Sequence, residues 1–232
     1  MIGLTAAEWA IVALSLKVSL VAIIASLPLA YGLAWLLARR RFAGRGLLDA
    51  AVHLPLVLPP VVTGYALLLL FGKAGPVGAW LYDTLGITLV FHWTGAALAA
   101  AVMALPLMVR ALRLSLEAVD TGLEEAARTL GAGRWHTFRT ITLPLTLPGI
   151  VAGGVLGFAR SLGEFGATIT FAANIPGETR TLPLAIYSAL QVPGTEMDVA
   201  RLAIISIILS ITALVTSEWL LRRQTGDDAH VL

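Results

Sequence analysis

Cysteine is absent from this chain of 232 residues. Its absence excludes disulfide bonds, thiolate metal sites and cysteine nucleophiles. The histidines are widely separated and form neither a His-Glu-x-x-His pattern nor a paired metal-ligand spacing; they are His53, His92, His136 and His230. The sequence therefore predicts no metal site, and we expect no catalytic residue and no cofactor.

Charged residues are also scarce. They make up 13% of the chain, whereas 58% of the residues are hydrophobic and the mean hydropathy is +0.86. A soluble domain carries about 25% charged residues, so the composition predicts an integral membrane protein embedded in the lipid bilayer. The net charge of +2 does not indicate nucleic acid as a partner.

A phosphate-binding loop of the form Gly-x-x-x-x-Gly-Lys-[Ser/Thr] is missing as well, because Gly72-Lys73 lacks the rest of that motif. If ATP drives this protein, another chain binds the ATP. The N-terminus has no basic region and carries Glu8 before a long apolar run, so we expect no cleavable secretion signal there.

Five apolar stretches are long enough for a helix to cross the bilayer core, which takes about 20 residues. They extend roughly from Trp9 to Ala38, Leu47 to Phe71, Trp93 to Leu112, Leu145 to Ala172 and Leu202 to Leu221. We therefore predict an all-α integral membrane protein in which residues 1–232 form a single transmembrane domain.

Arginines indicate the orientation of these spans, because positive residues concentrate in cytoplasmic loops. They cluster after the first span, between the third and fourth, and after the fifth: Arg39, Arg40, Arg41, Arg45, Arg110, Arg113, Arg128, Arg134, Arg139, Arg222 and Arg223. The pattern predicts a multi-pass protein of the inner membrane with a periplasmic N-terminus and a short cytoplasmic tail at 222–232.

The apolar segment from Leu182 to Leu190 is too short to span. Its nine residues form a helix of about 14 Å, about half of the hydrocarbon core. Prolines at 176, 183 and 193 surround it. We predict a re-entrant helix or a gate helix on the periplasmic face.

Prolines also interrupt the second span, where Pro55, Pro59 and Pro60 precede Thr63 and Gly64. A proline inside a helix removes a backbone hydrogen bond and kinks the helix. In lipid the freed carbonyls need partners from protein or from a water-filled cavity. Any one of these prolines is explained by a kink used only for packing. Together, Pro55, Pro59 and Pro60, followed by Thr63 and Gly64, indicate the lining of a pathway, and its candidate residues are Pro59, Pro60 and Thr63.

A polar segment at about 117–144 separates the third and fourth spans. Asp120 is placed to cap a helix, and Glu124 and Glu125 lie in its first turn, where the helix dipole favours negative charge. Gly131 and Gly133 are expected to end the helix and to permit a sharp reversal.

A second short helix is predicted from Arg134 to Ile141, and Pro144 is expected to start the fourth span, since proline is tolerated in a first turn. The alternative is an ordinary connecting loop with helical content. Two short helices exposed on the arginine-rich side of the membrane are, however, suited to docking into another protein.

The spacing Glu-Ala-Ala, three residues, Gly, nine residues, Ile-x-Leu-Pro resembles the signature loop of ABC importer permeases. The matching residues are Glu125, Ala126, Ala127, Gly131, Ile141, Leu143 and Pro144. More narrowly, the chain is similar to the permease subunits of molybdate transporters over nearly its whole length, in the segments 53–60, 128–133, 140–149, 160–168 and 174–180. Sulfate and thiosulfate permeases share part of these motifs, above all Arg-x-x-Gly-Glu-Phe-Gly.

The resemblance implies the fold of a type I ABC importer transmembrane domain. It also implies that the polar segment is a coupling loop, with the seven motif residues in contact with a cytoplasmic ATPase. Because the ATPases act as a pair and this chain offers one loop, a homodimer follows. A periplasmic binding protein would deliver the oxyanion. Molybdate is the expected cargo, and sulfate, thiosulfate and tungstate are the alternatives.

Two charged residues fall inside the predicted fourth span. Arg160 and Glu164 are four residues apart, so on one helix they share a face and can pair, with Thr168 on the same stripe and Ser161 beside it. A lone charge at mid-bilayer costs about 2.5–3.5 kcal/mol. Either the pair only fixes helix packing, or Arg160 supplies positive potential for a divalent oxyanion while Glu164 holds it in place.

Two other classes of protein compete with a transport subunit. An intramembrane enzyme needs convergent catalytic groups, and neither His53 nor His92 has a nucleophile at a suitable spacing. A channel needs a selectivity filter, and the sequence contains no pore-loop motif. The docking segment favours the transport subunit over both.

Overall fold

The computed structural model describes residues 4–226, with side chains described as far as residue 216, and this part of the chain is all helical. The elements in order are α1 Ala6–Arg39, α2 Arg45–Val57, α3 Pro60–Phe71, α4 Pro76–Leu85, α5 Trp93–Ala118, α6 Thr121–Thr129, α7 Arg134–Thr137, the π-helical turn η1 Phe138–Thr142, α8 Leu143–Leu162, α9 Gly166–Phe171, α10 Leu182–Leu190 and α11 Glu196–Gly226.

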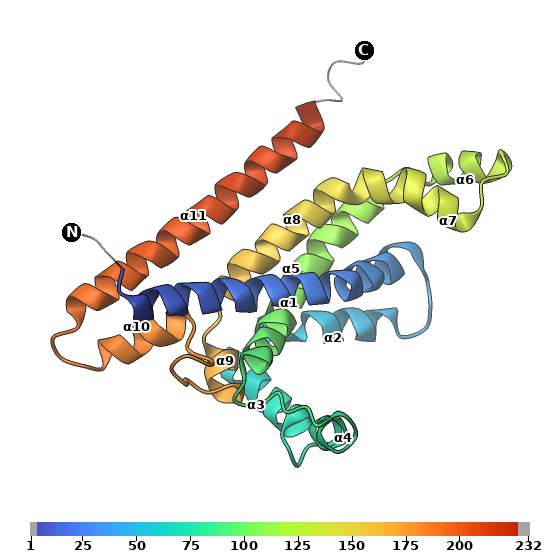
Figure 1. Cartoon of the computed structure of the whole chain (residues 1–232). Coiled ribbons are helices and arrows are strands. Elements are labelled where there is room, and N and C mark those ends of the chain that lie inside the picture. Colours follow the sequence, from blue (N-terminus) through green and yellow to red (C-terminus); the bar gives the residue numbers. More distant parts are fainter. Residues whose placement is uncertain (1–3, 227–232) are drawn as a thin grey trace.

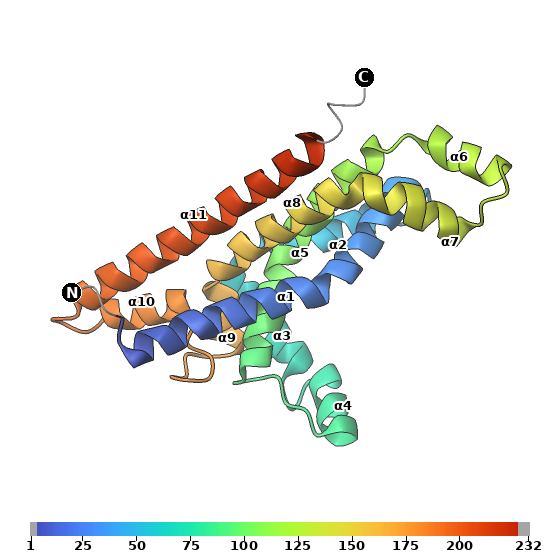
Figure 2. The ribbon, with the colours of Figure 1, turned by 45° about the horizontal axis from the view of Figure 1, so that its top comes forward.

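Helix α5 lies at the centre of the bundle, between α1 and α8 (Figures 1 and 2). Its buried face is rich in alanine, with Ala96, Ala99 and Ala104 fully buried. Small side chains let membrane helices approach closely, because little apolar driving force acts between helices in lipid and association depends on close packing. Met108 and Leu112 continue the same face into the largest cluster of buried residues.

Helix α8 contributes a complementary stripe of glycine. Gly149, Gly153 and Gly157 are all buried and recur every fourth residue, so they share one face of the helix. A Cβ atom on Gly157 would lie 2.8 Å from Met108 Cγ and 2.9 Å from Ile23 Cδ1. The missing side chains therefore allow α8 to pack against both α5 and α1.

Within the described part of the chain, four helices are long and apolar enough to cross a membrane, or five if the bent pair α2–α3 counts as one span. The all-α membrane fold predicted from the sequence is confirmed. The second predicted span, however, is not one helix, because α2 and α3 meet at an angle of 117°. Leu58 and Pro59 each precede a proline, which disfavours the helical conformation, and both adopt extended ψ angles of 144° and 133°.

The fourth predicted span is also wrong at its end. Helix α8 stops at Leu162, and the short helix α9 begins separately at Gly166. Arg160 therefore lies in the last turn of α8, Glu164 lies in the link, and Thr168 belongs to α9. These residues do not form one stripe on a continuous helix.

The arginine clusters of the sequence gather at one end of the bundle, which we call the arginine-rich end. Arg39 at the end of α1 lies 3.4 Å from Glu124 of α6, and Arg113 near the end of α5 lies 3.3 Å from Asp49 of α2. Helix α11 runs towards the same end (Figure 1). The side chains of Arg222 and Arg223, and all of 227–232, lie outside the described residues.

The opposite end joins the start of α1 to α10 and α11. Glu8 Oε1 lies 3.1 Å from Arg201 Nε, and Arg201 also pairs with Asp198 within α11. The backbone N–H of Leu182 donates to Ser15 Oγ at 2.7 Å, which fixes the start of α10 against α1. Helix α10 covers Leu182–Leu190, the segment that the sequence marked as a short helix.

Candidate functional site

The polar segment between α5 and α8 begins as the sequence predicts. Asp120 caps α6, since its Oδ1 accepts a hydrogen bond of 2.8 Å from the N–H of Gly122. The helix ends in a reversal at Gly131, whose φ of 91° suits glycine and strains other residues. Gly133 has an ordinary φ of −68° and precedes α7, so only one of the two predicted glycines makes the turn.

The second helix of the segment does not stop before the fourth span. Pro144 is the second residue of α8, in its first turn as predicted, but residues 134–162 form one continuous helical stretch of 29 residues that includes α7, η1 and α8. Proline has no N–H to donate and clashes with the carbonyl four residues earlier. The π-helical turn lies just before it, with the N–H of Leu143 bonded to the carbonyl of Phe138, and its wider winding accommodates the proline.

The coupling-loop residues predicted from the sequence differ in exposure. Four are exposed and three are half-buried: Glu125, Ala126, Gly131 and Pro144, then Ala127, Ile141 and Leu143. Two apolar residues that sequence reasoning did not single out project beside them, with Leu130 89% exposed and Trp135 68% exposed. An exposed leucine and tryptophan at the tip of a polar loop are typical of a protein-docking surface.

Glu124 faces the membrane spans. Its Oε1 accepts a hydrogen bond of 2.7 Å from Thr142 Oγ1 of η1 and lies 3.4 Å from Arg39 Nη2 of α1. The sequence assigned Glu124 only to the helix dipole and Arg39 only to topology. Their contact is missed because they are 85 residues apart.

The two helix breaks lie against each other, where α3 crosses α9. A Cβ atom on Gly64 would lie 2.6 Å from the carbonyl oxygen of Ala167, and one on Gly166 would lie 2.7 Å from Pro60 Cβ. The structure therefore brings the proline-rich turn of the second span next to the link that follows Arg160. These are the two regions that the sequence selected as candidate pathway.

The candidate pathway residues are not all accessible. Thr63, Ser161 and Thr168 are buried, whereas Pro59 and Pro60 are exposed. The hydroxyls of Thr63 and Ser161 have no hydrogen-bond partner among the described residues. A buried hydroxyl without a partner costs about 1–3 kcal/mol, but the hydroxyls of Ser19, Thr181 and Ser206 share this property, so it does not by itself mark Thr63 and Ser161 as pathway groups.

Arg160 and Glu164 do form the predicted ion pair, with Arg160 Nη1 2.6 Å from Glu164 Oε2. Arg160 keeps a quarter of its side chain exposed, whereas that of Glu164 is only 2% exposed. Glu164 Oε1 also accepts a hydrogen bond of 2.8 Å from the N–H of Ala167 in the first turn of α9. One carboxylate therefore connects the end of α8 to the start of α9.

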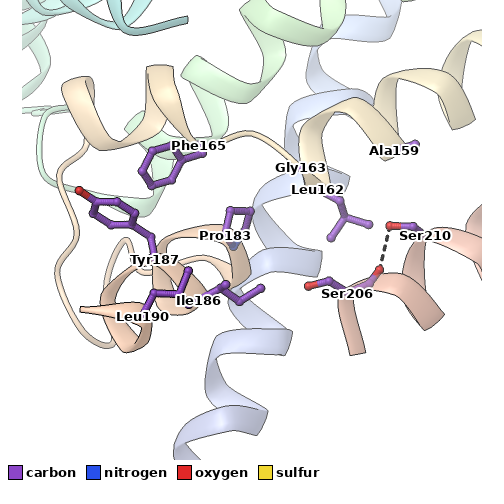
Figure 3. A pocket seen from close by; sticks show the side chains of 10 residues that line it. All are labelled: Ala159, Leu162, Gly163, Phe165, Pro183, Ile186, Tyr187, Leu190, Ser206 and Ser210. Atoms are coloured by element: carbon purple, nitrogen blue, oxygen red, sulfur yellow. Dashed lines mark hydrogen bonds between the residues drawn. The ribbon is translucent and has the colours of Figure 1, made fainter. Parts of the chain in front are cut away.

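A cavity of about 370 Å³ lies next to this link, between the end of α8, α10 and α11. Figure 3 shows Phe165 and Tyr187 on one side and Ser206 and Ser210 on the other. The two rings lie 4.9 Å apart between their centroids. The lining is largely apolar, which suits an aliphatic surface better than a free oxyanion.

The loop between α9 and α10 is attached to the start of α5. Glu178 Oε1 lies 3.1 Å from His92 Nδ1 and accepts a hydrogen bond of 3.3 Å from the N–H of Trp93. Lys17 Nζ lies 3.6 Å from the centre of the Trp93 ring. The contact with His92 and the N–H of Trp93 hold the pKa of the Glu178 carboxyl below its usual range. In the part of the chain that the structure describes, no cluster of three or more metal-ligating side chains is present.

Comparison with known proteins agrees with this architecture. The profile of the family described as "Binding-protein-dependent transport system inner membrane component" matches residues 26–225. The chain is 64% identical over 219 residues to the molybdenum transport system permease protein ModB of Escherichia coli (strain K12), which covers 94% of this chain and 96% of that protein. It is 44% identical over 183 residues to the sulfate transport system permease protein CysT of Escherichia coli (strain K12), covering 78% and 64% respectively.

The fold also matches a crystal structure of a bacterial ABC transporter involved in the import of the acidic polysaccharide alginate. The TM-score is 0.72 at 18% identity, with 95% of this chain and 80% of that chain covered. The chain therefore belongs to the family of binding-protein-dependent transport system inner membrane components. Within that family its sequence is more similar to this molybdenum permease than to the sulfate permease, which confirms the predicted resemblance.

Proposed function

We propose that this chain is the membrane-spanning permease subunit of an ATP-driven molybdate importer. The observation that carries the proposal is its 64% identity, over nearly the full length of both chains, to a molybdenum transport permease. The sulfate permease is less similar, at 44%, so sulfate or thiosulfate is the second candidate. Tungstate has the same charge and shape as molybdate and is expected to compete with it.

ATP would be bound and hydrolysed by a separate cytoplasmic ATPase pair. The support is the missing phosphate-binding loop in this sequence together with the exposed coupling loop. Glu125, Ala126 and Gly131 face solvent, and Leu130 and Trp135 add apolar area beside them. We propose that this surface contacts the ATPase. The half-buried Ile141 and Leu143 attach it to α8.

A homodimer would supply one coupling loop to each ATPase subunit. Helix α11 offers a surface for this assembly, because its side chains, as far as they are described up to residue 216, are largely exposed within one chain. Exposed apolar side chains occur on several of its faces: Ile204, Ile207, Ile208, Ile211, Leu214 and Val215. Lipid or a second copy of the chain would cover them. The periplasmic binding protein would dock at the opposite end, near α10 and the N-terminus.

The pathway would pass the two helix breaks. Arg160 is the proposed source of positive potential, and Glu164 orients it. The partnerless hydroxyls of Thr63 and Ser161 are the proposed polar groups beside it, with Pro59, Pro60 and Thr168 forming the surrounding wall. Movement of the coupling loops would open this region alternately to the two sides of the membrane.

Uptake by the reconstituted complex tests the proposed function. Proteoliposomes containing the chain, its ATPase and its binding protein should accumulate labelled molybdate with ATP but not with a non-hydrolysable ATP analogue. An equal concentration of tungstate should reduce the uptake, and an equal concentration of sulfate should not. Competition by sulfate would assign the chain to sulfate transport, and failure to carry any of the three oxyanions would contradict the proposal.

A further inference from the structure

We propose that Glu124 transmits the movement of the coupling loop to the membrane spans, whereas its neighbour Glu125 faces the ATPase. The inference rests on the proposed function, since it assigns separate roles within the proposed coupling loop. It concerns a positioning residue, because Glu124 acts through the helices that it contacts.

A single carboxylate oxygen of Glu124 joins three elements. It belongs to α6, accepts a hydrogen bond from Thr142 of η1 at 2.7 Å, and pairs with Arg39 at the end of α1 at 3.4 Å. The same Nη2 atom of Arg39 also donates to the carbonyl oxygen of Val119 at 3.3 Å. Glu124 therefore links the coupling loop to the first membrane helix and to the helix that continues into α8.

Apolar side chains do not hold α6 against the membrane helices in place of this link. Helix α6 has no buried residue, and its one large apolar side chain, that of Leu123, is 49% exposed. By contrast, the side chains of Glu124 and Arg39 are each only 15% exposed. Hydrogen bonds to charged groups are roughly twice as strong as neutral ones, and removing one member of a largely buried pair leaves the other charge uncompensated.

The adjacent glutamate has the opposite environment. Glu125 is exposed, and no ion pair or side-chain hydrogen bond joins it to another described residue. Successive residues on an α-helix point about 100° apart, so one of the two faces the spans and the other faces solvent. The sequence alone does not say which, and the contact with Thr142 decides it.

The position of Thr142 allows a movement of α6 to act on the helix that continues into α8. It is buried, and it is the last residue of the π-helical turn that precedes α8. Irregular turns of this kind often mark functional points in a helix. A shift of α6 would act on this turn through Thr142 and, at the same time, on the end of α1 through Arg39.

The test compares Glu124→Gln with Glu125→Gln in the complete complex of chain, ATPase and binding protein. Glu124→Gln should retain ATPase binding and ATP hydrolysis, but the oxyanion carried per ATP hydrolysed should fall by about twofold to thirtyfold, the range for residues that carry coupling between sites. Glu125→Gln should instead lose ATPase binding. The matched control is Asp49→Asn, which removes an ion pair with Arg113 at the same end without touching α6.

Two results would overturn the assignment. One is a wild-type ratio of transport to hydrolysis in Glu124→Gln, and the other is loss of ATPase binding in that variant. The ratio is measured with whichever of molybdate, tungstate or sulfate the wild type carries, so a wrong choice of oxyanion does not affect it. A wild-type complex that carries none of them contradicts both this inference and the proposed function.

A charge exchange separates coupling from folding. Arg39→Glu and Glu124→Arg should each uncouple transport, and the double variant should recover part of the ratio, because the Thr142 hydroxyl can donate to a carboxylate or accept from a guanidinium. Recovery is expected to be partial, since Glu at position 39 cannot donate to the Val119 carbonyl. The pair does not carry the linkage if the double variant has no higher ratio of transport to ATP hydrolysis than the single variant with the lower ratio.

Discussion

The carboxylate of Glu164 contacts two groups at once. They are the guanidinium of Arg160 and a backbone N–H in the first turn of α9. Both contacts connect the end of α8 to α9, so they give Glu164 a role in the fold that does not depend on a transported anion. Arg160 has the less constrained side chain, a quarter exposed, and it keeps donors free beyond the pair. At the scale of single residues, the structure therefore favours a structural role for Glu164 and leaves Arg160 as the group available to an anion.

Replacement of Arg160 tests this division. Arg160→Ala should lower oxyanion uptake by about tenfold or more, the effect of losing a charge-assisted hydrogen bond of about 1.5–3 kcal/mol. Binding of the ATPase should remain at the wild-type level, because Arg160 is in the last turn of α8, whereas the coupling loop leads into the first turn of that helix. Membrane level is checked by immunoblot, with Arg41→Ala, an exposed arginine at the arginine-rich end, as the matched control. Normal uptake by Arg160→Ala would remove it from the pathway.

Glu178 gives the fold a dependence on pH. Its pKa is lowered by the contact with His92 and by the N–H of Trp93, so the contact stabilises the folded chain above the ordinary glutamate pKa. This stabilisation is lost as the pH falls through the lowered pKa. Glu178→Gln should therefore reduce the thermal midpoint slightly at neutral pH, and its difference from the wild type should shrink in acid. Thermal unfolding of the solubilised protein across pH measures this, with Asp83→Asn as an exposed control.

At the scale of elements, the sequence predicted the uninterrupted spans well and the interrupted ones poorly. Helices α1, α5 and α11 contain the first, third and fifth predicted spans, because hydropathy alone defines a long apolar helix. The prolines at 59 and 60 indicated a kink but not its size, which is 117°, or the packing of α3 against α9. The break after Leu162 has no proline to mark it, and Glu164, which lies in the link, accepts a hydrogen bond from the N–H of Ala167 in α9.

In the candidate site too, the sequence predicted local features and missed a contact between residues far apart in the chain. Capping by Asp120, the turn at Gly131 and the pair of Arg160 with Glu164 are local, so spacing was enough to predict them. The contact of Glu124 with Arg39 and Thr142 is not local, and only the tertiary structure reveals it. Residue type could not distinguish Glu124 from Glu125, because both are glutamates in one helical turn.

The crossing of α3 and α9 makes an element-scale prediction about Gly64. Alanine in place of a helical glycine ordinarily stabilises by about 1 kcal/mol. At Gly64 the new Cβ would lie 2.6 Å from the Ala167 carbonyl oxygen, so Gly64→Ala should instead destabilise by about 1–3 kcal/mol. Gly32→Ala is the matched control, because no atom lies within 4 Å of the corresponding Cβ in α1. Equal thermal midpoints for the two variants would contradict the close crossing.

For the whole molecule, orientation is the property that the proposed function needs most. Because the chain has no cysteine, each introduced cysteine is unique. Thr129→Cys, exposed on α6, should react with a membrane-impermeant maleimide only after permeabilisation, whereas Thr84→Cys, exposed on α4, should react in intact spheroplasts. The reverse pattern would place the coupling loop outside and exclude a cytoplasmic ATPase as its partner.

Helix α10 has a further consequence for the whole molecule. With nine residues it rises about 14 Å, whereas the hydrocarbon core is about 30 Å thick. The cavity beside Ile186 and Leu190 borders this short helix, and mismatch of a spanning helix with the bilayer costs fractions of a kcal/mol per Å. Because α10 does not cross the bilayer, we expect a change in lipid acyl-chain length to act on the tilt of the long helices α1, α5 and α11 and not on α10.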